Sequence, residues 1–538
     1  MQSIHSITHK GIKHIRYITS YNQILKRHFT SNLIDFNDTK TSFESKSFIQ
    51  LLRGYFVFQS CRLPWIVNKS EDLIRYSYKF LGNTITDTVL KYTYFKHFCA
   101  GEDTISIRPV IQSFDRNGVG SILDYAAEAD ITEDTMDLLK DLTEEERDIS
   151  VRTYDYKNEE LCDRRMETFA DCLRSANAVK GYSTNGFVAI KCTALTDPKL
   201  LEKMSTTVTE LRNLFLKFDI DGSGFITKDE FRKQYERHFS GSGAEVEEVF
   251  RMLDSDQDGM VDYVSWSNII TIEDLYKLTS HCKVKGPLFN ATFTTEEREM
   301  LLRMRTRLNT LAELASKMDV HMMIDAEHTY FQPAIDNIAY TLMNSYNQNK
   351  AVIFTTYQMY LTDSMGRLLT DLKRAELGNY YFAAKLVRGA YMELERKRAE
   401  DMGYKDPIQP SKQATDDNYN EGVAEVLRRI RDGKKVELMI ASHNQSSVEN
   451  TIRMMSEHGI PNDGPVHFAQ LMGMADHLTY GLGKQKYKAY KYVPYGQVKE
   501  VMPYLTRRAI ENSGMLGGAK LEIQMFRAEI LRRLGLGK

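Results

Sequence analysis

Oxygen-bearing side chains recur at fixed spacing in residues 219–230, which read DIDGSGFITKDE. In a twelve-residue calcium loop, positions one, three, five, seven, nine and twelve supply oxygen ligands, the seventh through its backbone carbonyl. These positions hold Asp219, Asp221, Ser223, Phe225, Thr227 and Glu230. Gly224 stands at position six, where such a loop turns sharply. The spacing predicts a calcium-binding EF-hand.

A second loop of the same kind occupies residues 254–265, DSDQDGMVDYVS. Its ligand positions hold Asp254, Asp256, Asp258, Met260 and Asp262. Position twelve is Ser265, which lacks the two oxygens and the charge of a closing glutamate. Because EF-hands pair, we expect one competent calcium site and one weak or structural partner. Whether calcium regulates the protein or only stabilises it stays open.

Two adjacent guanidinium groups stand in YLTRRAIEN, residues 504–512. On a helix, Tyr504 shares a face with Arg508, and Arg507 shares a face with Glu511. Paired arginines can bind a carboxylate through bidentate, charge-assisted hydrogen bonds. Considered by itself, this pattern is more often a surface salt-bridge ladder. The helix alone therefore leaves both interpretations open.

Polar residues also end a series of apolar runs. Eight runs of strand length lie at 121–127, 187–192, 320–327, 351–358, 382–391, 436–444, 466–472 and 490–496, most of them separated by segments of helical period. Their ends carry Lys191, Asp325, Gln358, Arg388, His443 and Tyr492. Alternating buried strands and helices predict an α/β fold, and eight strands predict a (βα)8 TIM-like barrel. In such barrels the chemistry lies at the C-terminal strand ends.

The elements around these strands suggest five parts of the chain. We predict a mitochondrial transit peptide at 1–34, a helical arm and linker at 35–118, the barrel start with a helical segment at 119–192, an EF-hand pair inserted at 205–275, and the rest of the barrel at 293–538. The leader has basic and hydroxylated residues but no acid before Asp35, as transit peptides do. We expect the aromatic residues of the arm to pack on the barrel; a membrane-surface face is the alternative.

Composition narrows the choice of partner and compartment. A formal net charge of −2 gives no reason to expect nucleic-acid binding. The six cysteines are scattered and have no zinc-ligand spacing, so we expect reduced thiols. No uninterrupted apolar run reaches the length of roughly 18 residues that a spanning helix needs. Any membrane contact is therefore expected to be peripheral.

Four segments in order carry a family resemblance: 385–399 (KLVRGAYMELERKRA), 439–444 (MIASHN), 468–476 (FAQLMGMAD) and 490–512, which ends in YLTRRAIEN. Together they resemble the proline dehydrogenase family, from about residue 100 to the C-terminus. The resemblance implies FAD-dependent oxidation of L-proline to 1-pyrroline-5-carboxylate. It also implies ubiquinone as electron acceptor, peripheral contact with the mitochondrial inner membrane, and a downstream pyrroline-5-carboxylate dehydrogenase.

The resemblance assigns roles to individual positions. It implies catalytic roles for Lys191, Asp325, Lys385 and Tyr492, and contact with the substrate for Lys191, Leu471, Tyr492, Tyr504, Arg507, Arg508 and Glu511. The flavin positions that it implies are Ala326, Gln358, Lys385, Arg388, Gly389, Ala390, Tyr391, Ser442 and His443. Bacterial members often have arginine where Lys385 stands, and lysine offers a point charge in place of a planar fork.

Three alternatives remain at this stage. A hydroxyproline dehydrogenase would be expected to carry a residue smaller than Tyr492, whose bulk crowds a ring hydroxyl. A Schiff-base lyase or aldolase on the same barrel would use Lys191 or Lys385 as its amine. A calcium sensor with a barrel scaffold would show no turnover, and it would need neither the arginine pair nor the lysine that ends a strand.

Overall fold

The computed structural model describes residues 34–63, 65, 66, 69–126, 157–178, 186–270, 272, 279–512 and 518–536. The predicted transit peptide, apart from Ile34, lies outside these ranges. The same holds for most of the acidic stretch between the first two barrel strands, of which the structure describes one helix, α10 (Glu159–Ala178).

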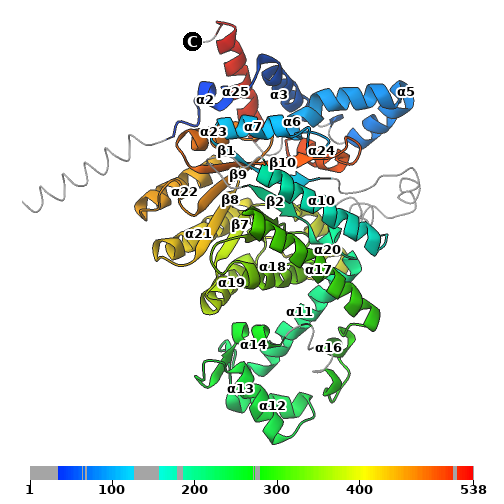
Figure 1. Ribbon diagram of the computed structural model, residues 1–538, viewed down its shortest axis with the longest axis vertical. Helices are drawn as coiled ribbons and strands as arrows, with labels where there is room; N and C mark the ends of the chain where they lie inside the picture. Colours follow the sequence, from blue (N-terminus) through cyan, green and yellow to red (C-terminus); the bar gives the residue numbers. More distant parts are fainter. Residues whose placement is uncertain are drawn as a thin grey trace, which may run out of the picture.

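Eight parallel strands form a closed barrel in the order β1-β10-β9-β8-β7-β6-β5-β2 (Figure 1). They are β1 (Val119–Tyr125), β2 (Phe187–Ile190), β5 (His321–Ile324), β6 (Ile353–Gln358), β7 (Phe382–Val387), β8 (Val436–Ala441), β9 (Val466–Leu471) and β10 (Lys488–Tyr495). Each strand coincides with one of the eight apolar runs. The predicted TIM-like barrel is confirmed.

One detail of the strand-end prediction is wrong. Tyr492 does not end its strand, because β10 continues to Tyr495. Its neighbour β9 ends at Leu471, however, and Leu471 is the register partner of Tyr492. The two strands are staggered, as they must be in a barrel whose strands tilt. Tyr492 therefore lies level with the C-terminal end of β9.

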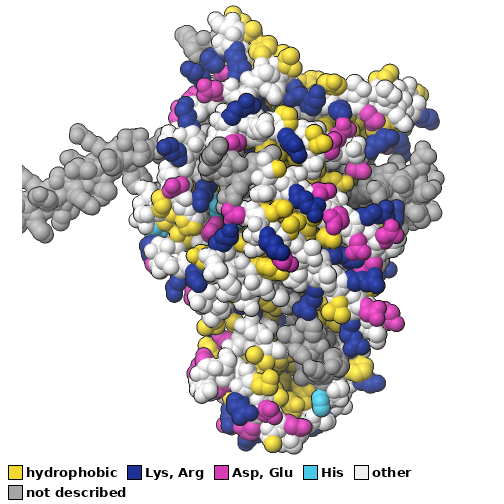
Figure 2. Space-filling model, in the orientation of Figure 1, with side chains coloured by type: hydrophobic (Ala, Val, Ile, Leu, Met, Phe, Trp, Pro, Cys, Tyr) yellow, Lys and Arg dark blue, Asp and Glu magenta, His cyan; other side chains and the backbone are white. Residues whose placement is uncertain are grey.

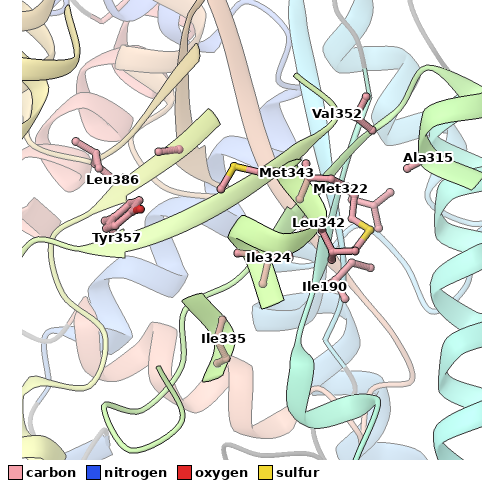
Figure 3. Packing of buried hydrophobic residues seen from close by; sticks show 14 of the residues in the cluster. Ile190, Ala315, Met322, Ile324, Ile335, Leu342, Met343, Val352, Tyr357 and Leu386 are labelled. Carbon is pink, nitrogen blue, oxygen red and sulfur yellow. The ribbon is translucent and has the colours of Figure 1, made fainter. Parts of the chain in front are cut away.

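Helices cover the outside of the barrel because each buries one apolar stripe against the strands. They include α17 (Thr295–Met318), α18 (Gln332–Tyr346), α19 (Ser364–Gly378), α21 (Lys412–Arg431), α22 (Gln445–Glu457) and α23 (Asp476–Lys484). Two further helices, α20 (Met392–Met402) and α24 (Met502–Glu511), follow β7 and β10. Figure 3 shows this packing, in which Met322 and Ile324 of β5 lie in one apolar cluster with Ile335, Leu342 and Met343 of α18. A second cluster, including Phe187, Phe354 and Tyr490, fills the barrel interior.

Between β2 and β5 the chain leaves the barrel and forms a pair of helix–loop–helix units, here called the insertion (Figure 1). It uses the end of α11 (Pro198–Phe218), then α12 (Lys228–His238), α13 (Gly243–Leu253) and α14 (Tyr263–Ile269). The two loops pair through short antiparallel strands, β3 (Phe225–Thr227) and β4 (Met260–Asp262). The insertion has its own apolar core, which includes Phe218, Phe231 and Trp266.

The insertion is attached to barrel helix α19 by polar contacts. Lys373 forms an ion pair with Asp262 of the second loop. Arg374 Nη1 donates hydrogen bonds to Ser267 Oγ at 3.0 Å and to Asn268 Oδ1 at 2.6 Å. These contacts join the end of the second loop and helix α14 to the outside of the barrel.

The helical arm consists of α2 (Thr39–Phe43), α3 (Phe48–Cys61), α5 (Ser70–Leu90), a π-helical turn (Lys91–Phe95) and α6 (Lys96–Phe98), followed by α7 (Arg108–Arg116). Phe58, Phe95 and Phe98 pack with α24 and the C-terminal helix α25 (Gly518–Arg533), as we expected. The expectation is wrong for other aromatic residues of the arm. Exposed fractions are 55% for Phe56, 59% for Trp65, 51% for Tyr76, 76% for Phe80 and 61% for Tyr92.

Apolar side chains therefore reach the surface at this end of the molecule (Figure 2). Among the described residues, no helix is both long enough and apolar enough to cross a membrane. All six cysteines are free thiols, as we expected from their spacing.

Asn347, directly after α18, forms hydrogen bonds to the backbone at the N-terminal ends of β6 and β7. It is fully buried, and its side chain donates to the carbonyls of Ile353 and Tyr381 at 2.8 and 2.9 Å. It also accepts from the backbone N–H groups of Val352 and Ile353 at 2.9 and 2.8 Å. Asn347→Ala leaves these four backbone groups unpaired, so we expect it to lower the free energy of unfolding by about 3 kcal/mol.

Urea unfolding monitored by circular dichroism measures this loss. Asn344→Ala, which changes an exposed residue on the same helix, is the matched control and should cost at most about 0.5 kcal/mol. Equal losses in the two variants would contradict the bracing role of Asn347.

Candidate active site

Three of the predicted catalytic residues meet at the C-terminal rim of the barrel. The carboxylate of Asp325, just after β5, accepts a hydrogen bond from Lys385 Nζ of β7 at 2.5 Å and one from the Tyr492 hydroxyl of β10 at 2.8 Å. The side chains of Lys385 and Asp325 are only 8% and 12% exposed. A charge so poorly hydrated must be paired, and this pairing fixes all three groups in place.

Tyr492 presents its ring beneath Lys385, whose Nζ lies 5.5 Å from the ring centroid. Burial, followed by the nearby carboxylates of Asp124 and Asp325, raises the pKa of the Tyr492 hydroxyl. The phenol therefore stays protonated and donates to Asp325. The rim thus combines a fixed cation with an aromatic surface against which a small ring could pack.

The Asp325 carboxylate is held by Lys385 and Tyr492. The charge of Lys191 acts on a residue that the sequence analysis missed, Glu327. Burial raises the pKa of Glu327 to about 7, against the opposing effects of hydrogen bonds from Thr193 and of Lys191. Glu327 lies in the segment VHMMIDAE, but no spacing rule singles it out.

Helix α24 lies near the same rim and carries the arginine pair. Arg508 is buried, and its Nη2 forms an ion pair with Glu511 at 2.6 Å. The carbon of its guanidinium lies 4.9 Å from the ring centroid of Tyr504, and that of Arg507 lies 6.0 Å from it. Glu511 thus orients Arg508, which stands three residues before it. A surface salt-bridge ladder would leave both arginines exposed to solvent. The burial of Arg508 therefore argues against that interpretation of α24.

Some buried polar atoms on α24 lack hydrogen-bond partners among the described residues. They include the Tyr504 hydroxyl and Arg508 Nε. Leaving a buried donor unpaired costs about 1–3 kcal/mol, and more for a charged group. Such atoms suit an anionic ligand that the protein binds at this place.

Gln358 ends β6 with a similar unsatisfied atom. Its Nε2 donates to the Glu327 carbonyl at 2.7 Å and is 2.9 Å from the Tyr360 hydroxyl. A carbonyl oxygen only accepts, so the amide orientation is fixed. Its Oε1 is buried and has no partner within the described part of the chain. This oxygen is available to a ligand N–H group.

His443 follows β8 and is neutral. Burial, followed by the charges of Lys491 and Arg508, lowers the pKa of His443 to about 3. Its Nε2 accepts a hydrogen bond from the Leu471 N–H at 3.0 Å. The proton of the neutral ring therefore resides on Nδ1, which makes this atom a donor.

Arg388, one of the predicted flavin positions, forms an ion pair with Asp416 and donates from Nη1 to Ser447 Oγ at 2.5 Å. These contacts hold its guanidinium between α21 and α22. At Gly389, an added Cβ would meet only the flexible end of Met392, at 3.0 Å. The protein itself has room for a side chain at this position, so its packing does not explain the glycine. The predicted flavin role of Gly389 stays a prediction.

The remaining predicted flavin positions lie around the same rim. The ring of Tyr391 lies 4.5 Å from that of His328 between centroids. Ser442 Oγ accepts from the Asn444 N–H at 3.1 Å. Ala326 and Ala390 follow β5 and β7 and are at least partly exposed.

A charged network that the sequence did not reveal lies beside His443. Asp476 forms ion pairs with Lys491 of β10 at 2.8 Å and with Lys46 of the helical arm at 2.9 Å. The two cations lower the pKa of Asp476 against the effect of its burial. The network ties the arm to the barrel, and its partners lie more than 400 residues apart in the chain.

Comparisons with known proteins agree with this geometry. The family model for proline dehydrogenase matches residues 107–520. The chain is 36% identical to proline dehydrogenase 1, mitochondrial, from Drosophila melanogaster, covering 94% of this chain and 81% of the relative. It is also 36% identical to the Homo sapiens protein of that name, covering 94% and 90%. Hydroxyproline dehydrogenase from Rattus norvegicus is 29% identical, covering 92% and 93%.

Solved structures show the same fold. Proline utilization A (PutA) from Bdellovibrio bacteriovorus, inactivated by N-propargylglycine, superposes with a TM-score of 0.54 at 16% identity; the match covers 95% of this chain and 42% of that one. PutA from Bradyrhizobium japonicum gives 0.52 at 13% identity, covering 94% and 44%. The chain thus spans less than half of these bacterial chains. The family match covers nearly the whole barrel, and with it the rim residues, so the chain belongs to the proline dehydrogenase family.

Proposed function

We propose that this chain oxidises L-proline to 1-pyrroline-5-carboxylate with FAD and passes the electrons to ubiquinone. The observation that carries the proposal is the buried Asp325–Lys385–Tyr492 group on a rim that also has an oriented arginine pair. Proline offers a carboxylate for the arginines and a small apolar ring for the aromatic surface. The residues predicted to contact substrate and flavin are proposed here in those roles.

The proposed chemistry assigns one task to each group. Arg507, Arg508 and Lys191 bind the proline carboxylate, and the unpaired Arg508 Nε gives that anion a donor. Tyr492 packs against the ring and is held by Asp325. These contacts place the C–H beside the ring nitrogen for transfer, because orientation supplies much of catalysis in a bound complex.

The residues around the rim fit a flavin. Gln358 Oε1 offers a buried acceptor, and His443 offers a donor at Nδ1. When bound, FAD accepts the hydride that proline loses. A fixed cation at Lys385 would favour the anionic reduced form of the flavin. Arg388 would reach the pyrophosphate by exchanging its contact with Asp416 for one with phosphate.

Two alternative enzymes are less well supported. A hydroxyproline dehydrogenase needs room for a ring hydroxyl, and Tyr492 is a large residue fixed by its bond to Asp325. The Rattus norvegicus hydroxyproline dehydrogenase is also less similar, at 29% identity, than the Homo sapiens proline dehydrogenase 1, at 36%. A Schiff-base enzyme needs a neutral amine, whereas Lys385 forms a buried ion pair at 2.5 Å.

We further propose a mitochondrial location with peripheral contact to the inner membrane. The Drosophila melanogaster and Homo sapiens relatives, at 36% identity, are named mitochondrial. The exposed apolar residues of the arm, including Trp65 and Phe80, suit the surface of a bilayer, where a quinone would be reached. The product would pass to a pyrroline-5-carboxylate dehydrogenase.

We propose that the insertion is an EF-hand pair with one calcium site. Carboxylate oxygens of Asp219, Asp221 and Glu230 lie within 4.8 Å of one another. Gly224 has a φ of 84°, which favours glycine at the sharp turn. The remaining proposed ligands are Ser223, Thr227 and the Phe225 carbonyl. These groups fit a calcium ion, which would draw the loop oxygens together.

The second loop also gathers carboxylates, from Asp254, Asp256 and Asp258. Asp262 at its ninth position is already engaged. It accepts from the Ser265 N–H at 2.8 Å and forms the ion pair with Lys373. With the Met260 carbonyl as its remaining ligand and no closing glutamate, this loop is proposed to be weak and to serve as a docking element.

The substrate proposal predicts a colour change. Purified protein should show flavin absorbance that anaerobic L-proline bleaches, because two electrons move to the cofactor. Absorbance spectroscopy measures this, with trans-4-hydroxy-L-proline compared at equal concentration. Bound flavin that L-proline leaves unchanged would reject the substrate, and faster bleaching by the hydroxylated ring would favour the alternative dehydrogenase.

If Arg508 binds the carboxylate of L-proline, its loss should impair substrate binding and leave flavin binding unchanged. Arg508→Met removes a buried charge-assisted contact, so the KM for L-proline should rise on the order of 100-fold while flavin stays bound. Steady-state kinetics and the flavin spectrum measure the two properties. Arg428→Met removes an exposed arginine with the same i,i+3 pairing to a glutamate, and it should leave KM unchanged. The proposal fails if both variants behave alike.

The calcium proposal predicts one tight site. Isothermal titration of chelator-treated protein should give one calcium per chain, and Glu230→Gln should weaken that site at least roughly 100-fold by removing a bidentate charged ligand. Asp256→Asn in the second loop is the matched control and should change it little. Two equal sites, or none, would contradict this assignment. Titrating calcium during turnover then separates a regulatory insertion from a structural one.

A further inference from the structure

Glu327, for which the sequence predicted no role, connects the ends of three neighbouring barrel strands. It follows β5 and is 2% exposed. Its carboxylate crosses to the loop after β2, where Oε1 accepts from the Thr193 N–H at 3.2 Å and Oε2 from the Thr193 hydroxyl at 2.7 Å. Its backbone carbonyl accepts from Gln358 Nε2 at the end of β6 at 2.7 Å. One residue thus contacts the strands on both sides of its own.

These contacts lie beside residues with proposed roles in the reaction. Thr193 belongs to a single 3-10 turn (Cys192–Ala194) that begins directly after Lys191. Holding Thr193 at two atoms therefore fixes the backbone from which Lys191 projects. The charge of Lys191 also acts on the Glu327 carboxylate. On the other side, the Glu327 carbonyl decides which way the Gln358 amide faces.

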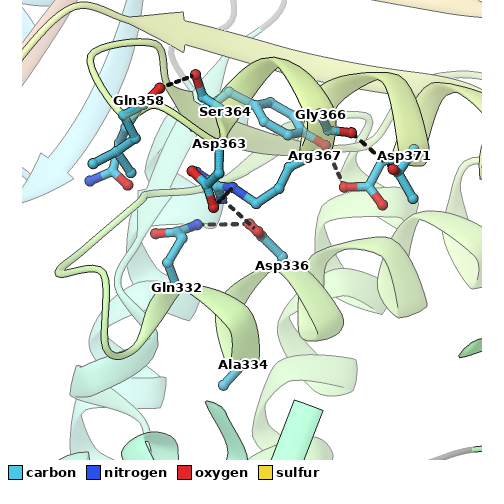
Figure 4. Close-up of polar contacts among 12 residues, drawn as sticks. Gln332, Ala334, Asp336, Gln358, Asp363, Ser364, Gly366, Arg367 and Asp371 are labelled. Carbon is cyan, nitrogen blue, oxygen red and sulfur yellow. Dashed lines mark hydrogen bonds and ion pairs between the residues drawn. The ribbon is translucent and has the colours of Figure 1, made fainter. Parts of the chain in front are cut away.

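The Glu327 backbone is itself held by a hydrogen bond to helix α18. Its N–H donates to Gln332 Oε1 at 3.1 Å, and Gln332 Nε2 donates to Asp336 Oδ1 at 2.8 Å. Asp336 pairs with Arg367 of α19 at 2.7 Å. Figure 4 shows this polar group between α18 and α19. A residue with its backbone fixed at both the N–H and the carbonyl can place its side chain accurately.

We propose that Glu327 is a positioning residue that sets Lys191 for the substrate carboxylate and Gln358 for the flavin. The inference rests on the proposed function, because it assigns both partners their roles there. The side-chain link to Thr193 serves Lys191, and the backbone link serves Gln358. Changing the side-chain link alone should therefore weaken carboxylate binding and leave flavin binding intact.

Thr193→Val removes the hydroxyl and keeps the backbone N–H and the side-chain shape. It should raise the KM for L-proline roughly tenfold, the scale of one lost hydrogen bond to a charged group, with kcat changed less than about threefold. The inhibition constant of cyclopentanecarboxylate, a ring acid without an amine to oxidise, should rise by the same factor. Thr193→Ser keeps a hydroxyl and should restore both values. Glu327→Gln keeps the backbone carbonyl that holds Gln358, so it should show the same split with an unchanged flavin spectrum.

Thr329→Val is the matched structural control. Thr329 also donates its N–H and hydroxyl to one buried glutamate, Glu395, at 2.8 and 2.5 Å, but it lies beside neither Lys191 nor Gln358 in sequence or hydrogen bonding. It should lower the melting temperature as Thr193→Val does and leave KM and the inhibition constant unchanged.

The inference is overturned if Thr193→Val leaves both constants within twofold of the wild type, or if Thr329→Val raises them equally. Wild-type protein that binds flavin and is not reduced by L-proline would instead reject the proposed function. Because Thr193→Val keeps the backbone contact, the test does not depend on whether Glu327→Gln folds.

Discussion

The ion pair between Lys385 and Asp325 is the contact around which the rim is organised. A barrel of parallel strands brings all its C-terminal ends together, and polar residues there are shielded from water by the surrounding loops. A charge in such a place must be neutralised by a neighbour. Asp325 meets this need with two donors, Lys385 and Tyr492, drawn from β7 and β10. The pairing thereby orients an aromatic ring and a cation toward the same space.

Other cations around this pair also lie beside carboxylates. Lys191 acts on Glu327, Arg508 pairs with Glu511, and Lys491 pairs with Asp476. Each of these three cations has a carboxylate beside it, but Tyr504, Arg508 and Gln358 keep polar atoms that no described residue satisfies. A rim that is balanced in charge and incomplete in hydrogen bonding suits binding of a zwitterionic substrate and a polar cofactor. A barrel that served only as the scaffold of a calcium sensor would not need such a rim.

Two accessory units are attached to the barrel by different means. The helical arm is joined by an apolar cluster and by the ion pair between Lys46 and the buried Asp476, so it behaves as part of the barrel end that carries the rim. The insertion has its own core and meets α19 through Lys373 and Arg374. Arg374 also contacts Asp371, which accepts a hydrogen bond from Tyr357, the residue before Gln358. The insertion is thus connected by polar contacts to a strand that ends at the rim.

The sequence by itself determined the parts that depend on local order along the chain. Short apolar runs located all eight strands, and ligand spacing located the loop from Asp219 to Glu230, because each pattern is complete within a few residues. Tertiary structure alone decided which residues pair. Lys385 meets Asp325 across 60 positions, Glu327 meets Thr193 across 134, and Lys46 meets Asp476 from opposite ends of the chain. Those partners are set by barrel closure and strand stagger, which no short sequence pattern encodes.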